Sequence, residues 1–149
     1  MNSALVEAFE ALVLQSFSLP EEQRAALKQL IQQNVGELGQ LMVLLVPQLE
    51  LLIGPQAKVE ELGPEQSKNR LMMTIVKFVH SFSSGEQSVV MFIDDIQWAD
   101  GLSVAVMSEL LNASPALNLL LVCTRRDTDS GAATSESLVR GLNESVGRE

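Results

Sequence analysis

Apolar residues in the first half of the chain recur at steps of three and four positions, the spacing that places them on one face of a helix. The pattern predicts helices over residues 3–15, 19–34, 35–46 and 65–82. Pro47 is expected to start a short segment of its own, because proline cannot continue the helix before it. Residues 54–66 hold two Gly-Pro pairs and few apolar side chains, which predicts an extended surface loop.

The pattern changes after residue 87, where two short runs of continuous apolar residues appear. Residues 88–94 read SVVMFID and residues 117–124 read LNLLLVCT. Such runs predict strands buried on both faces, as in a parallel sheet. Asp100 is placed to cap a helix over residues 101–113, and a crossover of this length joins parallel strands in a right-handed sense. The predicted fold class is therefore α/β, with a helical first half.

Length and composition indicate about one domain with a real core, since 46% of the 149 residues are hydrophobic. The net charge of -9, without any basic patch, argues against nucleic acid and against anionic membrane surfaces as partners. The start of the chain is unlike a signal peptide, no uninterrupted apolar stretch can span a bilayer, and Cys123 is the single cysteine. These features predict a soluble, cytoplasmic protein. Cys123 is expected in the core, His80 on a solvent-facing helix surface, and residues 128–149 in a flexible tail.

Asp94 and Asp95 follow the first predicted strand directly. Two carboxylates at the end of a buried strand repel each other and lose hydration unless a positive or hydrogen-bonding group faces them. A divalent cation suits this position, because ligands of open α/β sheets bind at the carboxyl edge of the strands. Taken alone, the pair fits equally well a turn that ends the strand and caps the next helix.

The residues around the pair carry a resemblance. The run VVMFIDDIQWADGLSVAVMSELL, followed by NLLLVCTRRD, resembles the second half of the ATPase module in the STAND branch of AAA-like P-loop NTPases, the type attached to signalling kinases and cyclases. The resemblance implies a partial AAA-like domain over residues 1–127, with the three-layer, parallel-sheet fold of P-loop NTPases. Residues 1–83 would form its helical insert, and residues 88–126 would run from the Walker B strand to the sensor strand.

By that resemblance, Asp94 corresponds to the Walker B aspartate that binds Mg²⁺, and Asp95 to the acidic residue that positions water. Arg126 matches the sensor arginine of the family's Thr-x-Arg pattern, which approaches the γ-phosphate, and Arg125 matches it less well. The signature that lies beside the nucleotide in the family corresponds to Gln97, Trp98, Ala99 and Asp100. The resemblance thus implies Mg²⁺ and ATP as cofactors. For Trp98, filling a local pocket is the alternative.

One motif of the family is missing from the sequence. A P-loop ATPase holds phosphates with GxxxxGK[ST], and none of the nine glycines precedes a lysine. The likeness begins downstream of that loop, so Met1 is expected to start inside the domain, and the sheet is expected to keep an exposed edge. ATP and Mg²⁺ binding by this chain is therefore expected to be weak, and hydrolysis by the chain alone is not expected.

The sequence thus predicts a partial ATP-binding module of a STAND-type signalling protein, in which the nucleotide state switches an attached effector domain. The alternative is a non-catalytic interaction domain whose helical first half binds a partner or self-associates. Nucleotide binding discriminates the two, because only the first requires it.

Overall fold

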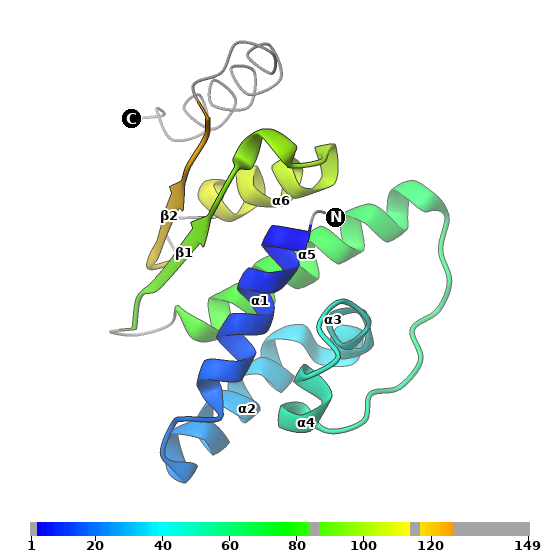
Figure 1. Cartoon of the computed structure of the whole chain (residues 1–149). Coiled ribbons are helices and arrows are strands. Elements are labelled where there is room, and N and C mark those ends of the chain that lie inside the picture. The colour runs from blue at the N-terminus through cyan, green and yellow to red at the C-terminus, as the bar shows by residue number, and fades with distance from the viewer. Residues whose placement is uncertain (1–2, 84–86, 114–116, 127–149) are drawn as a thin grey trace.

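A computed structural model describes residues 3–83, 87–113 and 117–126 of the chain (Figure 1). Its elements are α1 (Ser3–Ser16), α2 (Glu21–Val35), the 3-10 turn η1 (Gly36–Leu38), α3 (Gly39–Leu45), α4 (Leu49–Ile53), α5 (Pro64–Phe82), β1 (Val89–Ile93), the 3-10 turn η2 (Ile96–Trp98), α6 (Gly101–Asn112) and β2 (Leu119–Cys123). The predicted helices and both strands are confirmed. The third predicted helix is divided into η1 and α3.

Proline and glycine set several of these boundaries. Pro64 is the first residue of α5, where its missing N–H costs no helical hydrogen bond. Gly36 ends α2 with a φ of 54°, and Gly54 ends α4 with a φ of 81°, conformations that glycine adopts without a steric penalty. The segment from Gly54 to Gly63 then runs without regular structure to α5, as the predicted loop requires.

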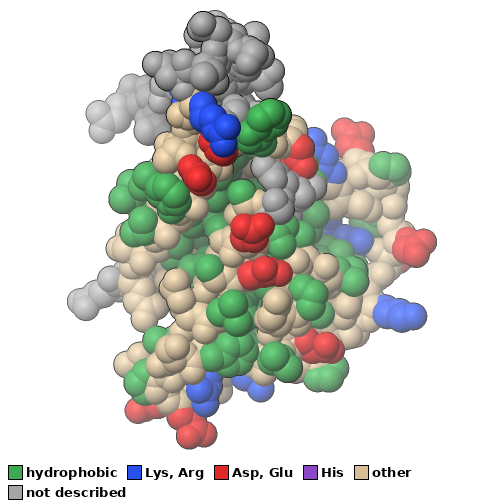
Figure 2. All heavy atoms as spheres, in the orientation of Figure 1, with side chains coloured by type: hydrophobic (Ala, Val, Ile, Leu, Met, Phe, Trp, Pro, Cys, Tyr) green, Lys and Arg blue, Asp and Glu red, His purple; other side chains and the backbone are tan. Residues whose placement is uncertain are grey.

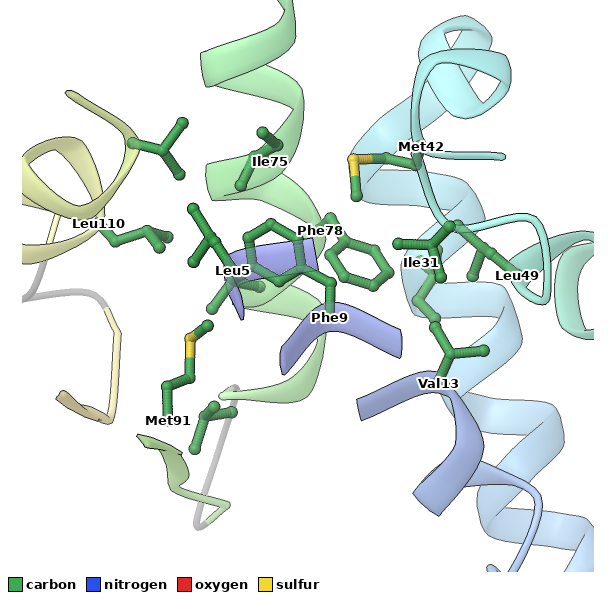
Figure 3. Packing of buried hydrophobic residues seen from close by; sticks show 14 of the residues in the cluster. Leu5, Phe9, Val13, Ile31, Met42, Leu49, Ile75, Phe78, Met91 and Leu110 are labelled. Atoms are coloured by element: carbon green, nitrogen blue, oxygen red, sulfur yellow. The ribbon is translucent and has the colours of Figure 1, made fainter. Parts of the chain in front are cut away.

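The hydrophobic core lies between the helices, with α5 at its centre (Figure 3). The Phe78 side chain of α5 is fully buried and makes edge-on contacts with Phe9 of α1 and Phe82, at ring-centroid distances of 6.0 and 5.1 Å. The other large, fully buried side chains are Leu5, Val13, Ile31, Met42, Val46, Leu49, Ile75, Val79, Met107 and Leu110. Every described α-helix contributes to this set, so the core joins the helical first half to the strand–helix–strand unit.

The two strands form a parallel pair whose register runs from Val89 opposite Leu119 to Ile93 opposite Cys123. The side chains of β1 alternate between a buried and an exposed face, and Val90 and Phe92 are 63% and 59% exposed. The prediction of strands buried on both faces is therefore wrong for the described part of the chain. Helices pack on one face, and no described element covers the other (Figure 1), so the described part of the chain shows two of the three expected layers.

Two smaller expectations are also corrected. Cys123 is exposed at the end of β2, although partial covering of its thiol raises its pKa. His80 is half-buried, and its Nδ1 atom is shielded from solvent without a hydrogen-bond partner in the described residues. Residues 128–149, expected to form a tail, lie outside the described residues. Among the described residues, no helix combines the length and apolar character of a membrane span.

Candidate functional site

The parallel register brings the residues that follow β1 beside those that follow β2. Hydrogen bonding continues past the strand ends: the backbone N–H of Thr124 donates to the carbonyl oxygen of Ile93 at 3.0 Å, and that of Ile96 donates to the Thr124 carbonyl at 2.9 Å. Asp94 and Asp95 consequently lie at the carboxyl edge of a parallel pair, where ligands of open α/β sheets bind. The position predicted for the two carboxylates is confirmed.

The hydroxyl of Thr124 connects the two aspartates. The backbone N–H of Asp95 donates to Thr124 Oγ1 at 3.1 Å, and Thr124 Oγ1 donates to Asp94 Oδ1. A hydroxyl has one proton to donate and lone pairs to accept, so Thr124 serves both residues at once. Thr124 had no predicted role of its own. The register of the two parallel strands reveals Thr124, because it places the first residue after each strand side by side.

Asp95 turns the chain sharply at the end of β1. Its φ and ψ angles are 52° and 50°, and it is the single non-glycine residue with a positive φ among the described residues. Aspartate tolerates this left-handed conformation better than most residues, because its short side chain can form local hydrogen bonds. The turn aims the Asp95 carboxylate away from the β1 direction and toward the end of β2.

Arg126 meets Asp95 there in a two-point ion pair. Arg126 Nε lies 3.2 Å from Asp95 Oδ1, and Arg126 Nη2 lies 2.9 Å from Asp95 Oδ2. Figure 2 shows acidic and basic side chains in contact near this end of the molecule. The Arg126 side chain is 68% exposed, so the pair contributes only about 0–1 kcal/mol to stability. Its geometry matters more: the candidate water-positioning acid and the candidate sensor arginine, 31 residues apart, are brought into contact.

The residues present fit a magnesium ion that is shared with phosphates. Asp94 is an exposed residue whose carboxylate lies next to the Thr124 hydroxyl, both of them oxygen donors. Among the described residues, no three His, Cys, Asp or Glu side chains form a metal-binding group. Mg²⁺ keeps several waters and is commonly held by one or two carboxylates together with substrate phosphates. Asp94 fits that role, whereas a metal site built from protein ligands alone does not fit.

The remaining signature residues, Gln97, Trp98 and Asp100, lie in η2 and at the start of α6. Trp98 ends η2 and is 73% exposed, so the alternative that it fills a local pocket is wrong. Gln97 lies in η2, and its side chain is outside the described part of the structure. Asp100 is the N-cap of α6, and its Oδ1 accepts a hydrogen bond from the backbone N–H of Ser103 at 2.7 Å. That hydrogen bond is the main reason why the pKa of Asp100 is lowered to about 2.

We expect Asp100→Ala to lower the free energy of unfolding by about 1 kcal/mol, because the first turn of α6 loses its side-chain acceptor. Asp100→Asn keeps an acceptor oxygen and should lose less. The carboxylate form of Asp100 is stabilised in the folded state, so its pH-dependent contribution is complete above about pH 4 and disappears as the pH falls toward 2. Urea unfolding of the three proteins between pH 2 and pH 6 measures both effects. Equal stability of the alanine variant throughout would contradict the capping role.

The strand–helix–strand unit with acidic residues at its carboxyl edge places the described part of the chain in the α/β class. Comparison with known proteins gives the family: the chain belongs to the AAA ATPase domain family, whose sequence model matches residues 2–122. The match includes Asp94 and Asp95 and ends before Thr124 and Arg126. Family membership supports an ATP-binding module.

A relative from Dictyostelium discoideum, hybrid signal transduction histidine kinase G, is 28% identical over 112 residues. That alignment covers 75% of this chain and 3% of the kinase, so the chain spans only a small part of the length of this relative. No solved structure gives a significant match.

Proposed function

We propose that this chain carries the magnesium and γ-phosphate side of a STAND-type AAA ATPase module that belongs to a signalling protein. The observation that supports the proposal best is the convergence of Asp94, Asp95, Thr124 and Arg126 at one edge of the parallel strands. The family match and the similarity to a signal transduction kinase support the module type and the signalling context.

In this proposal each side chain has a separate task. Asp94, oriented by Thr124, would hold Mg²⁺ through its water shell, and Asp95 would accept a hydrogen bond from a water molecule and orient it. Arg126 would donate its guanidinium hydrogen bonds to γ-phosphate oxygens. Bound Mg²⁺ would supply neutralisation of the negative charge on the phosphates.

The Asp95–Arg126 pair has a consequence for binding. The guanidinium group of Arg126 donates its hydrogen bonds to the Asp95 carboxylate, which is negatively charged like a phosphate. An arriving phosphate therefore competes with Asp95 for the same donors. Release of Asp95 would leave its carboxylate available for a water molecule, so phosphate contact and water positioning are linked through one arginine.

In the proposed site, the contacts to the phosphates are the least complete part. The 149 residues contain no GxxxxGK[ST] motif, whose backbone N–H groups and lysine supply most contacts to the phosphates. We propose that this chain alone binds MgATP weakly, with a dissociation constant of about 1 mM, and does not turn it over.

Trp98 provides a direct test, because it is the single tryptophan and lies three residues after Asp95. We expect its fluorescence to change saturably when ATP is added with Mg²⁺, and to change much less with ATP and EDTA. Asp94→Asn removes the charge with little change of shape, and should weaken the Mg²⁺-dependent response by about tenfold or more. The matched control is Glu50→Gln, on the exposed surface of α4, which should respond like the wild type.

The result that would overturn the proposed function is the absence of a Mg²⁺-dependent response in the wild type up to several times the expected dissociation constant. Quenching of Trp98 by iodide shows independently that the reporter is exposed and sensitive. A response that is equal in Asp94→Asn and in the wild type would also contradict it, because the magnesium would then be held elsewhere.

Contact with an effector domain or with a second copy remains a separate proposal. Its support is the exposure of Leu44 on α3 and Leu51 on α4, which are 72% and 79% exposed. Single exposed leucines are common on soluble proteins, so the two carry less weight than the convergence at the strand ends. Mass measurement by light scattering over a hundredfold range of concentration tests self-association.

A further inference from the structure

We propose that the pocket between α3, residues 58–62 and the start of α5 binds a small aliphatic carboxylate, with the guanidinium group of Arg70 as its anchor. The pocket shares no lining residue with the strand ends, and the proposal does not depend on nucleotide binding. Three features of the described residues carry it: the wall of the pocket, the hydrogen-bond donors in that wall, and the balance of its charges.

The irregular segment between α4 and α5 forms one wall of the pocket. Figure 1 shows this segment curving away from α4 before it reaches the first turn of α5. The pocket has a volume of about 540 Å³, which lies within the range of small-molecule sites. The apolar part of its wall consists of Leu41, Leu44, Val59 and Leu62. Leu44 is 72% exposed, so a hydrocarbon chain that covers it removes apolar surface from water.

Arg70 is a half-buried arginine of α5 whose hydrogen bonding is incomplete. Its Nη2 donates to the backbone carbonyl oxygen of Glu60 at 2.7 Å, and its Nε is shielded from solvent without a partner in the described residues. Arg70 forms no ion pair with the described part of the chain. A shielded donor without an acceptor is unfavourable, and a guanidinium group binds a planar carboxylate through two parallel hydrogen bonds. A carboxylate therefore supplies the acceptor that Arg70 lacks.

The segment beside Arg70 is fastened to α5 by weak contacts. Besides the Arg70 hydrogen bond, the Ser67 hydroxyl donates to the Leu62 carbonyl oxygen at 3.1 Å. Both acceptors are neutral carbonyl oxygens, whereas a hydrogen bond from a guanidinium to a carboxylate is roughly twice as strong. An arriving carboxylate therefore displaces the Glu60 carbonyl from Arg70, and the segment turns aside to uncover Nε.

Gln40 supplies a second donor from the opposite wall. It belongs to α3 and lines the same pocket, and its amide forms no hydrogen bond with the described residues. An amide N–H can donate to one carboxylate oxygen while Arg70 donates to the other. The two residues thus hold the polar end of the ligand, and the leucines and Val59 contact its hydrocarbon end.

The charges in the wall select the kind of anion. Lys58 and Arg70 are balanced by Glu60 and Glu61, so the wall has no net charge before the ligand binds. A monocarboxylate adds one negative charge, whereas a phosphate monoester adds nearly two close to the same two glutamates. Like charges at short range disfavour binding, so the pocket favours a carboxylate over a phosphate.

The test is a titration of the isotope-labelled full chain with sodium hexanoate, followed by the backbone amide shifts in heteronuclear NMR spectra. We expect saturable shifts at the pocket residues, with a dissociation constant of about 1 mM. Arg70→Gln removes the anchor and should weaken binding by about tenfold or more. Lys68→Gln is the matched control, because it removes the same charge from an exposed position of α5 outside the pocket. Its affinity should stay within about twofold of the wild type.

A comparison of ligands on the wild type keeps the proposal testable if Arg70→Gln does not fold. Hexanol has the same hydrocarbon chain without the carboxylate, and it should bind at least about tenfold more weakly than hexanoate. Hexyl phosphate should also bind more weakly, because of its additional charge. Equal affinities for hexanol and hexanoate would overturn the proposal, as would tighter binding of hexyl phosphate. It is also overturned if folded Arg70→Gln binds like the wild type, or if hexanoate causes no saturable shifts at the pocket.

Discussion

Replacing Phe78 by alanine is expected to lower the free energy of unfolding by about 3–5 kcal/mol, the largest effect of any single change considered for this chain. The Phe78 ring is fully buried at the centre of the core and contacts Phe9 and Phe82 edge-on. Its removal loses the transfer free energy of the side chain and leaves a cavity that the surrounding helices fill only in part. Urea unfolding followed by circular dichroism measures the change.

Phe92→Ala is the matched control for this prediction, because it is the same substitution at a side chain that is 59% exposed. A change of less than about 1 kcal/mol is expected, since little apolar surface is removed from water when Phe92 folds into β1. Equal destabilisation by the two variants would show that the core is not centred on α5. A negligible effect of Phe78→Ala would contradict the helical packing directly.

Thr124→Val is expected to cost about 1–2 kcal/mol and to loosen the turn that follows β1. Valine has nearly the shape of threonine but lacks the hydroxyl, so Asp94 loses a donor and the backbone N–H of Asp95 loses its acceptor. Amide hydrogen exchange at Asp95 should become faster, and urea unfolding should report the loss of stability. The Mg²⁺-dependent response of Trp98 should weaken in parallel if Asp94 holds the cation.

Thr124→Ser retains the hydroxyl and should preserve slow exchange at Asp95. The comparison isolates the hydroxyl from the methyl group, which a change to alanine would not do. Fast exchange at Asp95 in both variants would attribute the effect to packing of the methyl group. Unchanged exchange in Thr124→Val would show that the Thr124 hydroxyl does not orient the two aspartates.

Elements with strong local signals were predicted correctly from the sequence. The helix spacing in α1, α2 and α5 repeats over several turns, and Pro64 and Gly54 mark boundaries by their own conformational limits. The change of period at residue 87 was enough to predict β1. The burial of the strands was predicted wrongly. An apolar run shows that a strand can be covered on both faces, but it does not show which elements cover it.

The candidate site, too, was predicted only in part from the sequence. The position of Asp94 and Asp95 follows from one rule, that acidic residues after a buried parallel strand emerge at its carboxyl edge. The left-handed turn at Asp95 and the double use of the Thr124 hydroxyl depend on atoms brought together from two strands. No local pattern encodes such contacts. The roles of Gln97, Trp98 and Asp100 beside a nucleotide stay predictions, although Asp100 has an independent structural role as a helix cap.

The two-stranded sheet, covered on one face, determines how the candidate site can come apart. Asp94 and Asp95 follow β1, whereas Thr124 and Arg126 follow β2, whose outer side chains are mostly exposed. Detachment of β2 would separate these pairs while the buried contacts among α1, α2 and α5 persist. We expect detachment of β2 to cost less free energy than unfolding of the whole domain. Any molecule that bridges the two strand ends shifts that equilibrium toward the closed form by mass action.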